Sequence, residues 1–218
     1  MSAAVDALLG LSPVIPVLVI EDEAAAVPLA RALAAGGVRA LEVTLRTPAA
    51  LPAIRAIADA VPEATVGAGT VLNAKDLEAA AKAGARFIVS PGLTDPLAEA
   101  ARAALLPFLP GVATAGEIMR GLDLGLRRFK FFPAETSGGA AAVAAFAGPF
   151  PDIRFCPTGG LTPANAPAYL SLPNVACIGG SWLAPKDAVR AGDWGRIEDL
   201  ARAAAALRDG GAWTSRRA

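Results

Sequence analysis

Residues 39–69 read RALEVTLRTPAALPAIRAIADAVPEATVGAG, and this stretch decides the fold class. Ala40–Leu45 and Thr65–Gly69 are short apolar runs with the length and composition of buried strands. Between them, Pro48–Ala60 is rich in alanine and predicts a helix, with Thr47 as a capping residue and Pro48 at the first helical position. A strand, a helix and a second strand make one β/α unit.

Similar units follow one another along the whole chain, at a repeat of roughly 20–25 residues. The predicted strands are Val14–Ile20, Ala40–Leu45, Thr65–Gly69, Phe87–Ser90, Leu106–Leu109, Arg128–Phe132, Ile153–Cys156 and Ala176–Ile178. Helices are expected between them, for instance over Ala24–Ala35, Pro48–Ala60, Lys75–Ala83, Pro96–Ala104, Ala115–Gly121 and Pro163–Leu170. Eight units without a linker predict one α/β domain over residues 1–218, a single (β/α)₈ TIM barrel, with residues 210–218 as a frayed tail. A doubly wound open sheet is the main alternative, although no Gly-x-Gly-x-x-Gly opens a helix after the first strand.

Composition excludes several classes of function. Lys+Arg and Asp+Glu both number 20, so the chain has no net charge with which to attract nucleic acid or an anionic membrane. The absence of histidine rules out Ser-His-Asp and Cys-His catalysis. The two cysteines suggest neither a disulfide framework nor a metal site, which suits a cytoplasmic protein. The apolar run from Ala3 to Ile20 lacks the basic start of a signal peptide, and no segment is suited to cross a bilayer.

Lys130 is the most unusual residue, because it lies among three phenylalanines in the run Arg128–Pro133. Side chains alternate along a strand, so Lys130 and Phe132 should share one face. If that face is buried, desolvation favours the neutral amine, which can attack a carbonyl and form a Schiff base. The alternative is an ordinary lysine at a strand end that extends to solvent.

Polar residues also lie at the carboxyl ends of other predicted strands. Glu42, Thr44 and Arg46 share one face of the second predicted strand, either as a functional set or as a structural Glu42–Arg46 ion pair. Thr70 ends the third strand after two glycines, and Pro91 follows the fourth in what could also be simple turn chemistry. All of these strands should open onto the carboxyl-terminal mouth of a barrel, where such folds keep their active sites.

Two glycine pairs follow the last two predicted strands, Gly159-Gly160 and Gly179-Gly180, the second followed by Ser181. In barrels this is the usual phosphate site, where backbone N–H groups and a helix N-terminus hold the anion. Thr162-Pro163 nearby is expected to begin that helix. A lysine nucleophile, a carboxylate, an arginine and a phosphate loop predict Schiff-base aldol cleavage of a phosphorylated keto acid.

Five segments then carry a family resemblance: residues 37–47, 66–72, 129–135, 156–160 and 177–182. They closely resemble the 2-keto-3-deoxy-6-phosphogluconate (KDPG) aldolase family of the Entner–Doudoroff pathway, some members of which cleave 4-hydroxy-2-oxoglutarate (KHG). The resemblance covers roughly residues 8–208 and leaves out the tail. It implies a homotrimer of TIM barrels, a class I mechanism that releases pyruvate, and neither metal nor cofactor.

The resemblance also assigns roles to residues of this chain. Lys130 would form the Schiff base, and Glu42 would be the general acid and base that acts through water. The substrate-binding residues would be Arg46, Thr70, Pro91, Phe132 and Thr158, and the phosphate-binding residues Gly159, Gly160, Gly180 and Ser181. A threonine at 158 fits the phosphogluconate enzymes, since galactonate-specific relatives tend to carry an aliphatic residue there. A non-covalent phosphosugar epimerase or isomerase, a non-catalytic trimeric barrel and a metal-dependent pyruvate aldolase remain as alternatives.

Overall fold

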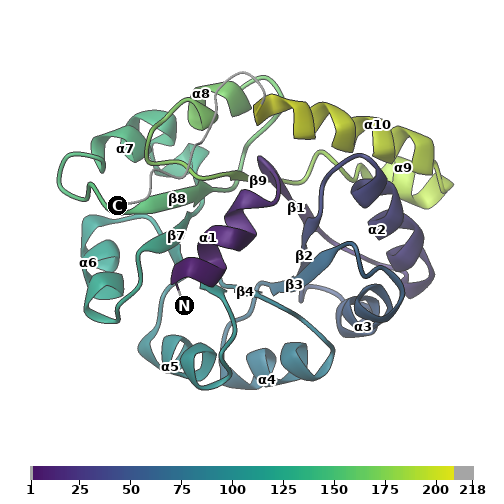
Figure 1. Ribbon diagram of the computed structural model, residues 1–218, viewed down its shortest axis with the longest axis horizontal. Helices are drawn as coiled ribbons and strands as arrows, with labels where there is room; N and C mark the ends of the chain where they lie inside the picture. The colour runs from purple at the N-terminus through teal and green to yellow at the C-terminus, as the bar shows by residue number, and fades with distance from the viewer. Residues whose placement is uncertain (1, 209–218) are drawn as a thin grey trace.

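The computed structural model describes residues 2–208 and shows strands surrounded by a ring of helices (Figure 1). The strands are β1 Val14–Leu18, β2 Ala40–Thr44, β3 Thr65–Gly69, β4 Ile88–Val89, β5 Phe108–Leu109, β6 Gly111–Val112, β7 Arg128–Phe131, β8 Arg154–Pro157 and β9 Ile178–Gly180. The α-helices are α1 Ser2–Gly10, α2 Ala26–Ala35, α3 Ala50–Ala60, α4 Ala74–Lys82, α5 Asp95–Ala103, α6 Ala115–Asp123, α7 Gly139–Ala145, α8 Ala166–Leu170, α9 Lys186–Ala191 and α10 Trp194–Ala205. Short 3₁₀ turns occupy Glu23–Ala25, Glu135–Ser137 and Ala206–Arg208.

All the named strands pair in parallel, which confirms the predicted α/β class. One sheet has the order β5-β4-β3-β2-β1-β9 and the other β6-β7-β8. The fifth predicted strand is divided, because only Pro110 separates β5 from β6 and a proline cannot donate a ladder hydrogen bond. Isolated parallel bridges join β8 to the segment around β9, at Phe155↔Val175 and Thr158↔Gly179.

Two hydrophobic clusters cover the strands, one on the outer face and one on the inner face. The larger one packs the outward side chains, such as Leu41 and Phe129, against the surrounding helices. The smaller one lies on the inner face and combines strand residues, such as Ala40 and Cys156, with α1. Because Ala40 and Glu42 are two residues apart on one strand, Glu42 shares this inner face. Near-continuous apolar strands are expected when both faces are covered.

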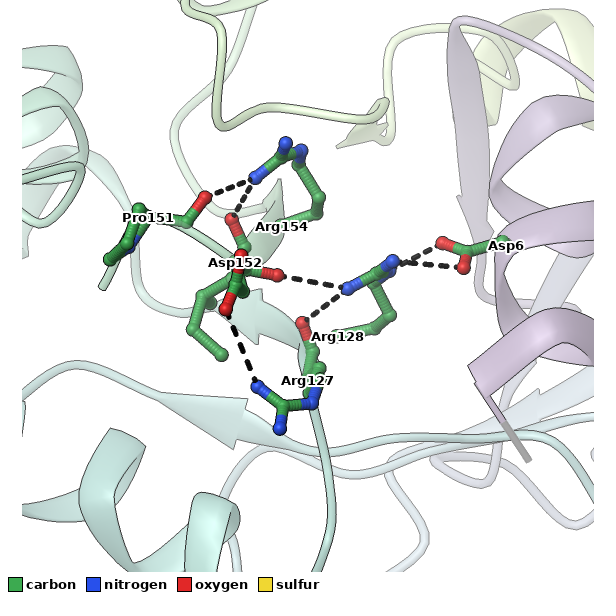
Figure 2. Close-up of polar contacts among 7 residues, drawn as sticks. Asp6, Arg127, Arg128, Pro151, Asp152 and Arg154 are labelled. Atoms are coloured by element: carbon green, nitrogen blue, oxygen red, sulfur yellow. Dashed lines mark hydrogen bonds and ion pairs between the residues drawn. The ribbon is translucent and has the colours of Figure 1, made fainter. Parts of the chain in front are cut away.

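Helix α1 lies across the strands in Figure 1 and brings Val5, Leu8 and Leu9 into the inner cluster. Figure 2 shows its Asp6 carboxylate pointing at the Arg128 guanidinium, at the amino end of β7. Arg128 Nη2 donates to Asp6 Oδ2 over 2.9 Å, and Nε donates to the other oxygen. The sequence did not predict this helix. It closes the end of the inner face that lies away from the strand carboxyl ends.

Two predicted helix starts are wrong. Helix α3 begins at Ala50, because the Thr47 hydroxyl donates to the Ile20 carbonyl instead of capping a helix. Helix α8 begins only at Ala166, after a turn that precedes it. Within residues 2–208, no helix combines the length and apolar character that crossing a membrane requires. The predicted tail at residues 210–218 lies outside the described residues.

Candidate active site

Lys130 and Glu42 form a buried pair on the inner face. Lys130 lies in β7 beside Gly111 and Cys156, and Glu42 lies in β2. The Lys130 Nζ donates to the Glu42 Oε1 over 3.1 Å, and the two side chains are only 6% and 4% exposed. Lys130 therefore does not extend to solvent, and that alternative is wrong. In this low-dielectric surrounding, the hydrogen bond between the two side chains is stronger than it would be in water.

Small neighbours make room for this pair. A Cβ atom on Gly69, at the end of β3, would overlap the Glu42 carboxylate and lie only 2.6 Å from its Cγ. Gly69 thus makes room for the Glu42 side chain and Gly67 for the Phe87 ring, where the sequence suggested the approach of a ligand. On the other side, the Lys130 Nζ lies 5.1 Å from the centre of the Phe132 ring. This contact favours a cation at Nζ through the ring quadrupole.

Arg46 and Thr70 are joined by a second contact at the carboxyl ends of β2 and β3. The Arg46 Nε donates to the Thr70 Oγ1 over 3.1 Å. Glu42 bonds to Lys130, so the Glu42–Arg46 ion pair considered from the sequence is wrong. Thr70 has φ of 57°, a left-handed conformation that is unusual for a β-branched residue and costs about 1–3 kcal/mol. Such strain at a strand end is typical of a functional position.

A pocket of about 150 Å³ opens beside these residues. Seven of the predicted site residues line it: Arg46, Phe132, Thr158, Gly159, Gly160, Gly180 and Ser181. Of the other four, Lys130 and Thr70 each contact a lining residue, and Glu42 and Pro91 lie behind Lys130. Lys130 lies against Phe132, Glu42 bonds to Lys130, and Thr70 bonds to Arg46. Pro91 packs against Gly111, the β6 partner of Lys130.

The glycine pair after β8 forms a left-handed loop at the pocket rim. Gly159 and Gly160 have φ of 103° and 80°, which disfavours any side chain there. The Gly160 carbonyl accepts a hydrogen bond of 3.2 Å from the Asn165 Nδ2. The helix predicted over Pro163–Leu170 does not start at the loop, because α8 has five residues and begins after Asn165. The loop itself, and not a helix end, is therefore the candidate anion cradle.

Thr158 faces the pocket from the end of β8 and is 5% exposed. Its partner across the isolated bridge is Gly179, where a Cβ atom would overlap the Thr158 side chain. At the next glycine, Gly180, the Trp182 ring occupies the space of a side chain. Both glycines after the eighth predicted strand are thus required by close packing.

Sequence analysis missed two residues that line the pocket, Val17 and Leu161, and its list of phosphate-binding residues left out Gly179 of the second glycine pair. Val17 carries a usable signal, because it lies two residues after Ile15 on the inner face of β1. Leu161 adjoins predicted residues and has no chemical signature of its own. Among the residues that the structure describes, no three acidic or cysteine side chains come close enough to hold a metal ion.

The comparisons with known proteins agree with one another. The family model for KDPG and KHG aldolase matches residues 5–200. A 2-dehydro-3-deoxy-phosphogluconate aldolase from Pseudoalteromonas atlantica is 60% identical over 194 residues, which is 89% of this chain and 90% of that one.

Two solved structures extend the likeness to the fold. The KDPG aldolase of Zymomonas mobilis with 3-phosphoglycerate has a TM-score of 0.89 and 55% identity, covering 93% of this chain and 95% of its own. The KDPG aldolase of Legionella pneumophila, with pyruvate captured as a covalent carbinolamine, has a TM-score of 0.90 and 46% identity, covering 92% and 98%.

Proposed function

The chain belongs to the KDPG and KHG aldolase family, and we propose that it cleaves 2-keto-3-deoxy-6-phosphogluconate to pyruvate and glyceraldehyde 3-phosphate. It would thus serve as the aldehyde-lyase of the Entner–Doudoroff pathway. The buried hydrogen bond between Lys130 and Glu42 carries this proposal. A second substrate, 4-hydroxy-2-oxoglutarate, would give pyruvate and glyoxylate by the same steps, since both keto acids present the same reacting end.

The first steps form a Schiff base. Lys130 passes a proton along its hydrogen bond to Glu42, which leaves a neutral amine. The amine attacks the C2 ketone of the substrate and forms a carbinolamine. Glu42 returns the proton to the departing hydroxyl, water leaves, and a protonated imine remains. Burial favours this route, because neither the neutral amine nor the carboxylic acid needs a hydration shell.

The imine then acts as the electron sink for cleavage. Glu42, again a carboxylate, accepts the proton of the C4 hydroxyl through a water molecule. The C3–C4 bond breaks, its electrons move onto the imine, and the aldehyde departs. The remaining enamine takes a proton at C3, and hydrolysis releases pyruvate and restores Lys130. Lys130 supplies the electron sink, so the mechanism needs neither metal nor organic cofactor, and activity should survive a chelator.

Substrate recognition follows from the pocket. Arg46 is fixed by Thr70 and would hold the carboxylate of the keto acid together with Thr158. Phe132 and Pro91 would shape the walls around Lys130. The backbone N–H groups of Gly159, Gly160 and Gly180, with the Ser181 hydroxyl, would bind the phosphate. A site made of backbone dipoles fits a protein whose net charge is zero.

The two sheets would form one closed (β/α)₈ barrel within a single domain. The pairing at Thr158↔Gly179 joins β8 to β9, and β5 and β6 would be one strand bent at Pro110. The family resemblance further suggests a homotrimer, which sedimentation equilibrium would test. The two cysteines, Cys156 and Cys177, are both buried, which suits a reducing cytoplasm.

Replacing Glu42 with Gln tests the proposed function. The amide keeps the shape but cannot accept a proton, so turnover of the phosphorylated keto acid should fall by about 100-fold or more. Some imine with pyruvate should still form, because the Lys130 nucleophile is intact. Release of pyruvate is followed through its reduction to lactate. Turnover unchanged from the unaltered protein would remove Glu42 from its role, and an unaltered protein that cleaves neither keto acid would overturn the proposed function.

A further inference from the structure

We propose that Tyr169 and Glu135 are positioning residues that keep a carboxylate away from the bound phosphate and thereby set the preference of the site for phosphorylated substrates. The proposal rests on the proposed function and adds two residues to it. Neither residue lines the pocket. Glu135 lies directly behind the glycine loop that forms the pocket rim, and Tyr169 contacts Glu135.

Glu135 is attached to this loop at its backbone. Its N–H donates to the Gly159 carbonyl over 3.1 Å, and the preceding N–H, of Ala134, donates to the Thr158 carbonyl over 2.8 Å. The side chain packs directly on the next glycine, since a Cβ atom on Gly160 would lie 2.7 Å from the Glu135 Cγ. The carboxylate carbon is therefore at most about 6 Å from the Gly160 Cα.

A carboxylate at this place is unfavourable for a phosphate site. A phosphate carries up to two negative charges, and like charges this close repel one another even in water. Among the described side chains, the Glu135 carboxylate has no ion pair with a lysine or arginine. It accepts a short hydrogen bond from the Tyr169 hydroxyl instead.

Tyr169 is well suited to hold the carboxylate in place. It comes from α8, is 1% exposed and packs into the larger hydrophobic cluster. Burial raises the pKa of its hydroxyl, and the hydrogen bond to Glu135 and the negative charge there raise it further. The hydroxyl therefore stays protonated and donates at neutral pH. The donor lies in the core, so the carboxylate is drawn back from the rim.

Steady-state kinetics with three variants test the pair. Tyr169→Phe keeps the buried ring but releases the carboxylate, and it should raise KM for the phosphorylated keto acid about fivefold, because screened repulsion of one charge at short range is of that order. The kcat for that substrate, and both constants for 4-hydroxy-2-oxoglutarate, should not change. Glu135→Gln keeps an acceptor for Tyr169 without the charge, so KM should stay near its original value. The double variant Tyr169→Phe/Glu135→Gln should restore KM, because no charge remains to be released.

Binding of inorganic phosphate, followed by titration calorimetry, separates this inference from the proposed function. Phosphate should bind about fivefold more weakly to Tyr169→Phe and normally to the double variant, whether or not the protein cleaves either keto acid. Equal losses for both keto acids, or a double variant no better than Tyr169→Phe, would show a purely structural pair and overturn the proposal. Phosphate binding that is absent, or the same in all variants, would overturn it as well.

Discussion

Replacing Gly69 with Ala tests the geometry of the proposed catalytic pair, Lys130 and Glu42, without changing either residue. The new Cβ atom would lie 2.6 Å and 2.7 Å from the Cγ and Cδ of Glu42, where ordinary contacts begin at 3.4 Å. The Glu42 side chain must therefore move by at least about 0.8 Å, since its carboxylate oxygen lies closer still. If it moves along the hydrogen bond, the 3.1 Å distance from the Lys130 Nζ to the Glu42 Oε1 grows to about 3.9 Å or more, which is beyond hydrogen-bond range.

We expect the kcat of Gly69→Ala for the phosphorylated keto acid to fall by about 10- to 100-fold, since misplacing a catalytic group by about 1 Å has effects of this size. The free energy of unfolding should fall by about 1–3 kcal/mol, because the site is already closely packed. A lactate-coupled assay measures kcat, and urea denaturation measures stability.

The matched control is Gly116→Ala, at an exposed position of α6 where an added Cβ meets no atom within 4 Å. This variant should keep full activity and be neutral or slightly more stable, because alanine restricts the unfolded chain. If Gly69→Ala showed the same kcat as this control while remaining folded, the account of a sterically positioned Glu42 would be refuted.

Three further substitutions should change stability at different places. Lys130→Met leaves the carboxylate next to it buried without a partner and should lower the free energy of unfolding at neutral pH by about 3–5 kcal/mol, as urea denaturation will show. Asp6→Asn weakens the contact to Arg128 in Figure 2 and, at a partly buried site, should cost about 1 kcal/mol in the same assay with little effect on KM. The third is Glu117→Gln at the start of α6. Burial raises the pKa of Glu117, but hydrogen bonds from the N–H groups of residues 113–114 outweigh it and leave the pKa below its usual value. A lowered folded-state pKa stabilises the protein above the unfolded-state value near 4.5, and that stability is lost as the pH falls through the folded value. The protein should therefore exceed Glu117→Gln in stability by about 1 kcal/mol at neutral pH, and the difference should shrink below about pH 4 in denaturation curves. A constant difference across this range would contradict the argument.

Most strands could be predicted closely from the sequence, because parallel strands covered on both faces are continuous apolar runs. The last is the exception, since the predicted Ala176–Ile178 shares only Ile178 with β9. Thr65–Gly69 was predicted without error, and Ala40–Leu45 ends one residue too late. Helix α1 was missed because its residues are almost uniformly apolar and show no helical stripe. Its role depends on inner-face side chains from distant strands, which no local pattern contains.

The sequence predicted which residues come together at the strand ends, and it did not predict their contacts. The alternation of side chains along the strands predicted that Lys130 and Glu42 both face the carboxyl-terminal mouth of the barrel. Their hydrogen bond joins residues 88 positions apart, which no local pattern predicts. For Glu42, the sequence offered Arg46 as a partner, because it is the nearest cation on the same face. In the structure, the pairing of β2 with β3 brings Thr70 next to Arg46, which donates a hydrogen bond to it. Glu42 instead accepts a hydrogen bond from Lys130.

The most direct measurement is borohydride trapping with pyruvate, followed by digestion and mass spectrometry of the peptides. The account predicts one reduced pyruvate adduct, on Lys130, and none at any other lysine. Lys130→Arg, which keeps the charge but cannot form the imine, should show no adduct and no turnover. Cleavage of the phosphorylated keto acid by a protein that never yields an adduct at Lys130 would contradict the central claim.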